Sequence, residues 1–401
     1  MLSLRLPSGS RRPTRPIARR LDKARLAVID ESLLWVAAIL LAFGLVMVYS
    51  ASIAMPDSPR YARLENSHFL LRHLLSIGIG VAAGVLAFAT PMRQWQRLSP
   101  WLFAGGLVLL FAVLVLGNVA LGATRWIRIG PLSLQPSELM KLFVVLYAAD
   151  YTIRKQDYML RFRKGFLPMG TAVVVVGCLL LLQRDLGAFV VICGIAMTVL
   201  FLGGISGRLF VGLVLAAVST IVMLIFAQPY RLARLELLLD DPFSPENAFG
   251  AGYQLTHSLI AFGRGELFGV GLGGSIEKLN YLPEAHTDFL LAVIGEELGL
   301  VGVLAVIGML FWLVRRGFEI GRQSIALDRP YSGLVAKGIA IWIAIQALIN
   351  IGVNTGVLPT KGLTLPLMSY GGSSILAVCL AIAILLRIDF ENRQMMRGGT
   401  A

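Results

Sequence analysis

Residues 186–207 read LGAFVVICGIAMTVLFLGGISG, and after one arginine, Arg208, residues 209–230 read LFVGLVLAAVSTIVMLIFAQPY. Each run holds more than 20 residues without a Lys, Arg, Asp or Glu. About 20 such residues cross the hydrocarbon core of a bilayer as a helix, because a lipid-exposed backbone must satisfy its own hydrogen bonds. A buried helix of a soluble protein would instead show a single apolar stripe. The two runs therefore predict two membrane-spanning helices.

The same pattern recurs along the chain, which is 57% apolar and only 15% charged. Soluble proteins usually carry about 25% charged residues. We therefore predict an all-α polytopic membrane protein with about ten transmembrane helices and a long folded outer loop between the seventh and the eighth. The predicted spans are 33–54, 73–90, 100–118, 137–153, 167–183, 187–204, 208–228, 289–314, 334–356 and 370–388.

Basic residues set the predicted orientation. Residues 1–31 hold eight Lys and Arg before the first span, and about two-thirds of the 36 Lys and Arg fall on segments that share their side of the membrane. This bias predicts cytoplasmic tails at 1–31 and 391–401, flanking a transmembrane domain at 32–390. The first span is too long for a cleaved signal peptide, so we expect an uncleaved anchor.

Residues 229–288 form the one long connection, which this orientation makes a periplasmic loop. Its charges, among them Arg231 and Arg234, are interrupted by apolar patches such as Leu235–Leu239. Such a mixture favours a loop that folds on the membrane surface over a disordered one.

Composition also disfavours several kinds of site. The cysteines Cys178, Cys193 and Cys379 lie inside apolar runs, and the four histidines lack metal-ligand spacing, so neither disulfides nor structural zinc is expected. The net charge of +13 could indicate nucleic-acid binding, but the basic residues flank spans, where topology explains them. We expect no nucleic-acid partner, and no nucleotide-binding loop is present.

The polar segment before the eighth span carries the strongest chemical signal. Asp288 stands where polar loop becomes apolar helix, a depth at which a carboxylate is costly unless it is paired or functional. Partial desolvation would raise its pKa toward that of a general base. A helix-capping role is an equally weighted alternative. Glu296 and Glu297 follow within the span, and we expect them to have interhelical partners.

A second outer segment links the last two spans. Its prolines and glycines, including Gly362, Gly371 and Gly372, exclude a regular helix, and non-helical backbone at membrane depth must be buried or line a cavity. Lys361 could hold a phosphate, or it could reach to the interface. The Gly371-Gly372 pair favours close helix packing.

A third group lies near the fourth span, where Arg125 precedes Glu138 and Lys141. Lys141 could pair with Glu138 three residues earlier, or it could face the same outer cavity as Lys361. In the long loop, Arg264 could meet an anionic head group.

These motifs, in this order, resemble the shape, elongation, division and sporulation (SEDS) family over nearly all of the chain after about residue 30. The resemblance is carried by LPEAHTDF at 282–289, IGEELG at 294–299, LPLMSYGGSS at 365–374 and QPSE at 135–138. PTKGLT at 359–364 is similar to the division branch of the family.

The resemblance implies a ten-helix fold and peptidoglycan glycosyltransferase activity on lipid II, an undecaprenyl-diphosphate disaccharide-pentapeptide. It implies the class B penicillin-binding protein FtsI as partner, FtsQ, FtsL and FtsB as further division partners, and a place among inner-membrane lipids at the division septum. The family's essential aspartate falls on Asp288. The predicted substrate-binding residues are Lys361, Lys141, Arg264, Arg125, Glu138, His286, Ser369, Gly371 and Gly372.

From this combination we predict that Asp288 removes the proton of the acceptor hydroxyl, which displaces undecaprenyl diphosphate with inversion to a β-1,4 linkage. Cations would balance the leaving group, and a divalent ion, Mg²⁺ or Mn²⁺ with Asp288 as one candidate ligand, is a further option. Two alternatives are a lipid II flippase and a non-catalytic division scaffold. A flippase should carry polar groups through the full membrane depth, whereas here they gather at the outer side.

Overall fold

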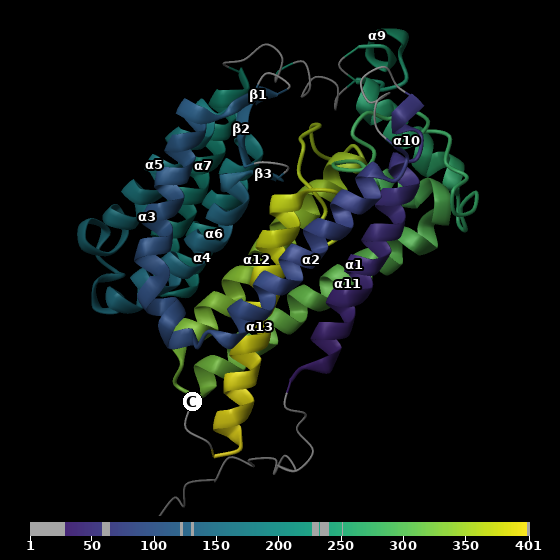
Figure 1. Cartoon of the computed structure of the whole chain (residues 1–401). Coiled ribbons are helices and arrows are strands. Elements are labelled where there is room, and N and C mark those ends of the chain that lie inside the picture. Colours follow the sequence, from purple (N-terminus) through teal and green to yellow (C-terminus); the bar gives the residue numbers. More distant parts are fainter. Residues whose placement is uncertain are drawn as a thin grey trace, which may run out of the picture.

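The computed structural model describes residues 29–57, 65–120, 123–129, 132–226, 232, 240–250 and 252–398. The predicted tail at 1–31 falls almost wholly outside these residues, as do Arg231, Arg234 and the patch Leu235–Leu239. Within the described part, ten long helices coincide with the ten predicted spans (Figure 1). They are α1 (Glu31–Ser52), α2 (His68–Ala89), α3 (Met92–Leu116), α4 (Pro136–Arg154), α5 (Leu167–Leu182), α6 (Leu186–Leu202), α7 (Gly207–Phe226), α11 (Leu290–Ala326), α12 (Pro330–Asn354) and α13 (Gly372–Met396).

Among the described residues, eight helical stretches are long and apolar enough to cross a membrane. The other two of the ten helices depart for visible reasons. Helix α6 is shorter, and α4 carries Glu138, Lys141 and Asp150, which are buried inside the protein instead of facing lipid. Large apolar side chains such as Trp101 and Leu86 are exposed on the outer helices, as lipid contact requires. The chain is a multi-pass membrane protein.

The helices pack around a central group formed by α4, α12 and α13. Helix α12 contacts α11, α4, α6 and α13, while α2 runs along α13 (Figure 1). Most of α12 and α13 is buried, whereas α7 lies at the periphery. The centre of the bundle is therefore where polar side chains can be shielded from lipid.

Short elements connect the spans. They are η1 (Met55–Asp57), β1 (Asn118–Ala120), β2 (Ala123–Ile129), β3 (Leu132–Leu134), η2 (Gln156–Tyr158), η3 (Phe162–Phe166), α9 (Pro245–Ala248) and α10 (Tyr253–Gly265). The three strands form an antiparallel sheet in the order β1-β2-β3, with Asn118 opposite Trp126 and Arg128 opposite Ser133. The all-α prediction missed this sheet, because three short strands between two spans leave little hydropathy signal. The sheet, α9 and α10 lie at one end of the bundle, here termed the sheet end (Figure 1).

Helix α11 differs most from its predicted span, since it continues to Ala326 instead of ending near residue 314. Beyond the apolar part, Glu319 pairs with both Arg315 and Arg316, so hydropathy marks only the first part of a longer helix. The helix is also broken at Gly299, whose φ is 66°. The segment after α10 fills the break, because Val270 N–H donates to the Glu296 carbonyl at 3.0 Å.

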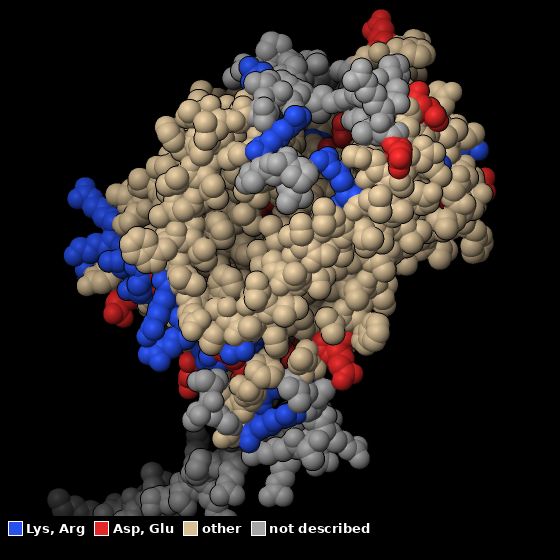
Figure 2. All heavy atoms as spheres, viewed as in Figure 1, with Lys and Arg blue, Asp and Glu red and all other residues tan. Residues whose placement is uncertain are grey.

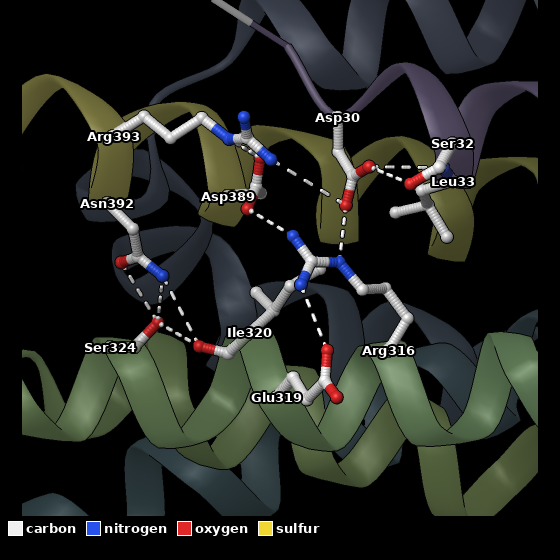
Figure 3. Close-up of polar contacts among 10 residues, drawn as sticks. All are labelled: Asp30, Ser32, Leu33, Arg316, Glu319, Ile320, Ser324, Asp389, Asn392 and Arg393. Carbon is white, nitrogen blue, oxygen red and sulfur yellow. Dashed lines mark hydrogen bonds and ion pairs between the residues drawn. The ribbon is translucent and has the colours of Figure 1, made fainter. Parts of the chain in front are cut away.

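The other end of the bundle holds a network of ion pairs (Figure 3). Arg316 of α11 donates to Asp30, just before α1, at 2.5 Å, and its guanidinium lies 3.5 Å from Asp389 of α13. Arg393 pairs with Asp389 at 2.5 Å and lies 3.9 Å from Asp30. The start of α1 and the end of α13 therefore lie at the same end, which an even number of spans requires. Helix α13 continues through residues 391–396 of the predicted C-terminal tail.

Candidate functional site

A cavity of about 460 Å³ opens near the sheet end. In Figure 2 basic side chains border a hollow at this end of the molecule. The lining residues come from α2, β2, β3, α4, the start of α6, the loop before α11, the segment between α12 and α13, and the start of α13. The cavity thus joins all three regions in which the sequence predicted chemistry.

Asp288 lines this cavity from the last turn before α11. The side chain is half-buried, and a Cβ atom on Gly362 would come within 2.4 Å of its Oδ2 atom. Glycine at 362 therefore makes room for the carboxylate. The N-cap of α11 is Phe289, which makes no side-chain cap. Among the described residues, the Asp288 carboxylate caps no backbone N–H, so the capping alternative finds no support.

The surroundings of Asp288 alter its acidity. The pKa of this carboxyl is raised to about 7, chiefly by burial. The negative charges of Glu284, Glu138 and Asp185 also raise it, and Glu284 contributes the most of the three. The positive charge of Arg125 acts in the opposite direction. A carboxyl group with a pKa near 7 can accept a proton near neutral pH and release it again.

Two guanidinium groups reach the cavity, those of Arg125 and Arg72. The Nη2 atom of Arg125 donates to the Arg184 carbonyl at 2.5 Å. Its Nε atom is buried and has no hydrogen-bond partner among the described residues. Arg72 was not predicted. Its signal is an arginine in the second turn of an apolar helix, which topology at the membrane surface also explains.

The two predicted lysines are placed differently. Lys141 is fully buried, and its Nζ atom donates to Glu138 at 2.7 Å and to Gln346 at 2.9 Å. Glu138 lines the cavity while Lys141 lies behind it, so the ion-pair alternative describes Lys141. Lys361 is half-buried and directly precedes Gly362, but it is not among the lining residues.

Of the remaining predicted residues, Gly371 and Gly372 line the cavity. Ser369 is buried, and its hydroxyl accepts from Leu365 N–H at 2.9 Å. His286 is also buried, which lowers its pKa to about 4, and its ring packs against Phe69 and Tyr370. His286 is therefore neutral at pH 7 and supports the wall of the cavity.

Arg264 lies away from the cavity, on α10. Its guanidinium pairs with Glu296 at 2.7 Å, and Glu296 also accepts from Ile276 N–H at 2.9 Å. Glu297 pairs with Lys278 at 2.7 Å and accepts from Ser50. The expectation that both glutamates have partners is confirmed, although the partners lie on α1, on α10 and on the loop after α10 instead of on one neighbouring helix.

Sequence reasoning missed a set of polar residues that shape the site. Asp185 caps α6 through Ala188 N–H at 3.3 Å and accepts from Ser137 at 3.0 Å, so it joins α4 to α6 beside the cavity. Gln346, Asn350 and Asn354 of α12 contact the segments that carry Asp288 and Gly362. Their signal was available, since a polar residue every fourth position in an apolar helix marks one buried face.

The described residues bring no three His, Cys, Asp or Glu side chains close enough together to hold a metal ion. Carboxylates do line the cavity, and magnesium sites often combine one or two carboxylates with phosphate oxygens of a substrate. Any ion-binding site here would thus need oxygen atoms from a ligand.

Comparison with known proteins agrees with this architecture. The profile of the FtsW/RodA/SpoVE family, described as cell cycle protein, matches residues 31–394. A Burkholderia thailandensis relative named "Probable peptidoglycan glycosyltransferase FtsW" is 60% identical over 382 residues, covering 95% of this chain and 82% of the relative. A relative of the same name from Escherichia coli O6:H1 is 46% identical over 380 residues, covering 94% of this chain and 89% of the relative.

Solved structures give the same result. One similar chain belongs to the work described as "Structural coordination of polymerization and crosslinking by a peptidoglycan synthase complex", with a TM-score of 0.73, 27% identity, and coverage of 92% of this chain and 99% of that chain. The rod shape determining protein RodA of Thermus thermophilus gives a TM-score of 0.66 at 27% identity and the same coverage. The sequence-based assignment to the SEDS proteins is confirmed: the chain belongs to the FtsW/RodA/SpoVE family.

Proposed function

We propose that this chain is a peptidoglycan glycosyltransferase that polymerises lipid II during septal cell-wall synthesis, with Asp288 as the general base. The observation that carries the proposal is one carboxyl group of raised pKa, about 7, in a cavity that two arginines also line. The activity named for the relatives, and the polymerisation studied in the similar complex, agree with this assignment.

In the proposed reaction, Asp288 accepts the proton of the acceptor sugar hydroxyl. The freed oxygen forms a bond to the anomeric carbon of the donor, and the bond from that carbon to the diphosphate oxygen breaks. The electron pair leaves with undecaprenyl diphosphate, and the configuration inverts to a β-1,4 linkage. The diphosphate is a good leaving group, so no protein acid is needed, and fixed cations stabilise its charge.

The structure favours Arg125 and Arg72 over Lys141 for that role. Both arginines line the cavity, and the Nε atom of Arg125 has no partner in the part of the chain that the structure describes. Arginine also binds phosphate oxygens in pairs, which a single ammonium group cannot do. Lys361, which directly precedes the lining residue Gly362, is proposed as a third cation that stabilises the leaving diphosphate. A divalent ion, Mg²⁺ or Mn²⁺, would bind with Asp288 and the diphosphate, and it would supply further charge neutralisation.

The proposal includes location and partners. We place the sheet end in the periplasm and both termini in the cytoplasm of a bacterial inner membrane, at the division septum. The proposed partner is the class B penicillin-binding protein FtsI, with FtsQ, FtsL and FtsB as further members of the complex. The similar structure from work on polymerisation and crosslinking supports a crosslinking partner.

The test replaces Asp288 with Asn, which keeps the size of the side chain and removes its basicity. The full chain is purified with FtsI, supplied with lipid II in detergent, and assayed for glycan polymer with transpeptidation blocked. We expect polymer from the natural chain and none from Asp288→Asn, while FtsI still copurifies with both. Polymer made at the normal rate by Asp288→Asn would refute the role of this residue. Failure of the natural chain to polymerise would favour the flippase or scaffold alternatives.

A further inference from the structure

A line of buried polar side chains runs along one face of α12. Trp342, Gln346, Asn350 and Asn354 follow one another at intervals of four residues, and all four are essentially inaccessible to solvent. Residues four apart lie on the same face of a helix. Burying an amide costs free energy unless its hydrogen bonds are satisfied, so the partners of this face indicate what it does.

The two asparagines bind the backbone at Asp288. The Nδ2 atoms of Asn350 and Asn354 each donate to the Asp288 carbonyl at 2.9 Å. Asn350 also donates to the Leu363 carbonyl at 2.6 Å, next to Gly362. One side chain thus holds the segment that carries the proposed base and the segment that makes room for its carboxylate.

The next residue along the same face extends this connection. Gln346 donates to the Thr364 carbonyl at 2.9 Å, and its Oε1 atom accepts from Lys141 at 2.9 Å and from Trp342 at 2.8 Å. Lys141 in turn holds Glu138, which lines the cavity. A single helical face therefore contacts three walls of the cavity.

Asn354 donates within α12 to the Asn350 carbonyl at 2.9 Å, and it also contacts the start of α11. Its Oδ1 atom accepts from Ala292 N–H at 3.2 Å. Helix starts leave such N–H groups without partners, and a short polar side chain at the N-cap usually binds the second or third of them. The N-cap here is Phe289, which cannot do so, and Ala292 is the third residue after it. Asn354 supplies, from a different helix, the side-chain cap that Phe289 lacks, and it shares the Ala292 N–H with the Phe289 carbonyl, which accepts at 3.0 Å.

We propose that Asn350 and Asn354 are positioning residues for Asp288. Asn354 caps α11 and so keeps the Asp288 carboxylate turned toward the cavity. Asn350 sets the spacing between Asp288 and Gly362. The inference rests on the proposed function, because it concerns the same carboxylate. Both asparagines contact the backbone and not the carboxylate, so they orient the base without competing for its proton.

The charged groups that share the cavity with Asp288 are Glu284 of its own loop, Arg125 of β2, Glu138 of α4, Asp185 at the start of α6 and Arg72 of α2. None of these is changed by substituting Asn350 or Asn354. A change in the pH dependence of the asparagine variants would therefore report a new environment of Asp288 and not a lost charge.

The experiment measures kcat, KM and the pH midpoint of lipid II polymerisation for Asn354→Ala, Asn350→Ala and Asn354→Asp in the purified full chain with FtsI. Thr355→Ala is the matched control, because Thr355 follows Asn354 and its hydroxyl bonds only within α12. We expect Asn354→Ala to lower kcat by roughly 10- to 100-fold with little change in KM, since a misplacement of about 1 Å can cost that much. The pH midpoint should fall, because a carboxylate that turns out of its position loses part of the burial and of the Glu284 charge that raise its pKa.

The other variants separate the Oδ1 contact of Asn354 from its Nδ2 contacts. Asn354→Asp keeps the size and the acceptor for the α11 N–H, but it loses the Nδ2 donor and adds negative charge, so its pH midpoint should rise while that of Asn354→Ala falls. Asn350→Ala should lower kcat with the midpoint unchanged. Equal kcat and equal midpoints in Asn354→Ala and Thr355→Ala would overturn the proposal. If Asp288→Asn abolishes polymerisation in that case, only the positioning role fails; if Asp288→Asn is active, the proposed function fails.

Discussion

Replacing Gly362 with alanine should disable the proposed base while leaving the fold intact. A Cβ atom at 362 would lie 2.4 Å from Oδ2 and 3.2 Å from Cγ of Asp288. Gly362 does not have a positive φ, so alanine meets no backbone strain at this position. The clash falls on the end of one short side chain, which can rotate, so the carboxylate and not the backbone must move.

The size of the effect follows from these distances. Ordinary contact between heavy atoms begins at about 3.4 Å, so the Oδ2 atom must retreat by roughly 1 Å. A displacement of that size in a catalytic group costs on the order of 100-fold in rate, or about 2.7 kcal/mol of transition-state stabilisation. The stability of the protein should change far less, because no backbone atom is displaced.

The assay compares kcat for lipid II polymerisation with the thermal stability of each purified variant. Gly308→Ala is the control, since Gly308 lies in α11, the helix that follows Asp288, and an added Cβ there meets nothing within 4 Å. We expect normal activity from Gly308→Ala and a loss near 100-fold from Gly362→Ala at similar melting temperature. Full activity of Gly362→Ala would show that the carboxylate position seen here is not the reactive one.

Three further predictions concern pH and buried charges. Because burial raises the pKa of Asp288 to about 7, its basic form is lost as the pH falls. We therefore expect kcat/KM to drop about tenfold per pH unit below pH 7 and to level off above it. A flat profile between about pH 5 and 8 would contradict this. Glu297→Gln leaves the Lys278 ammonium buried without its 2.7 Å counter-charge, which should cost roughly 3–5 kcal/mol and lower the melting temperature; an unchanged melting temperature would show that the pair is dispensable. Arg316→Ala removes the centre of the network in Figure 3 and should lower the free energy of unfolding by roughly 1–3 kcal/mol, measured by thermal unfolding in detergent. Arg315→Ala is the control and should cost less, because Arg315 is exposed.

Much of the fold could be predicted from the sequence. All ten spans were placed, including α4, although Glu138 and Lys141 lie near its start. The sequence did not predict the long continuation of α11 or the sheet at 118–134. Hydropathy reports where lipid surrounds a helix, and it is silent about helix that continues into water and about short strands outside the membrane.

The candidate site was only partly predictable. Asp288 stands out in the sequence because a carboxylate at a loop-to-helix junction must be paired, functional or capping, and its position in the cavity agrees with the functional alternative. The cations were harder to predict. Of the two alternatives for Lys141, the ion pair with Glu138 is the one observed, while the unpredicted Arg72 lines the cavity. A sequence shows which charges exist but not which of them neutralise one another.

The sequence by itself determined that the chain crosses the membrane many times, because more than 20 uncharged residues in succession leave an α-helix as the way to satisfy the backbone in lipid. It also determined where that regularity must fail, at the glycines and prolines between the last two spans. The tertiary structure alone decided how the cavity works. Asn354 caps α11 through Ala292, which lies 62 positions earlier in the chain. Gly362 makes room for the carboxylate of Asp288, which lies on a different segment. Hydrogen bonds and close contacts act over a few ångströms of space, and distance along the chain does not report that separation.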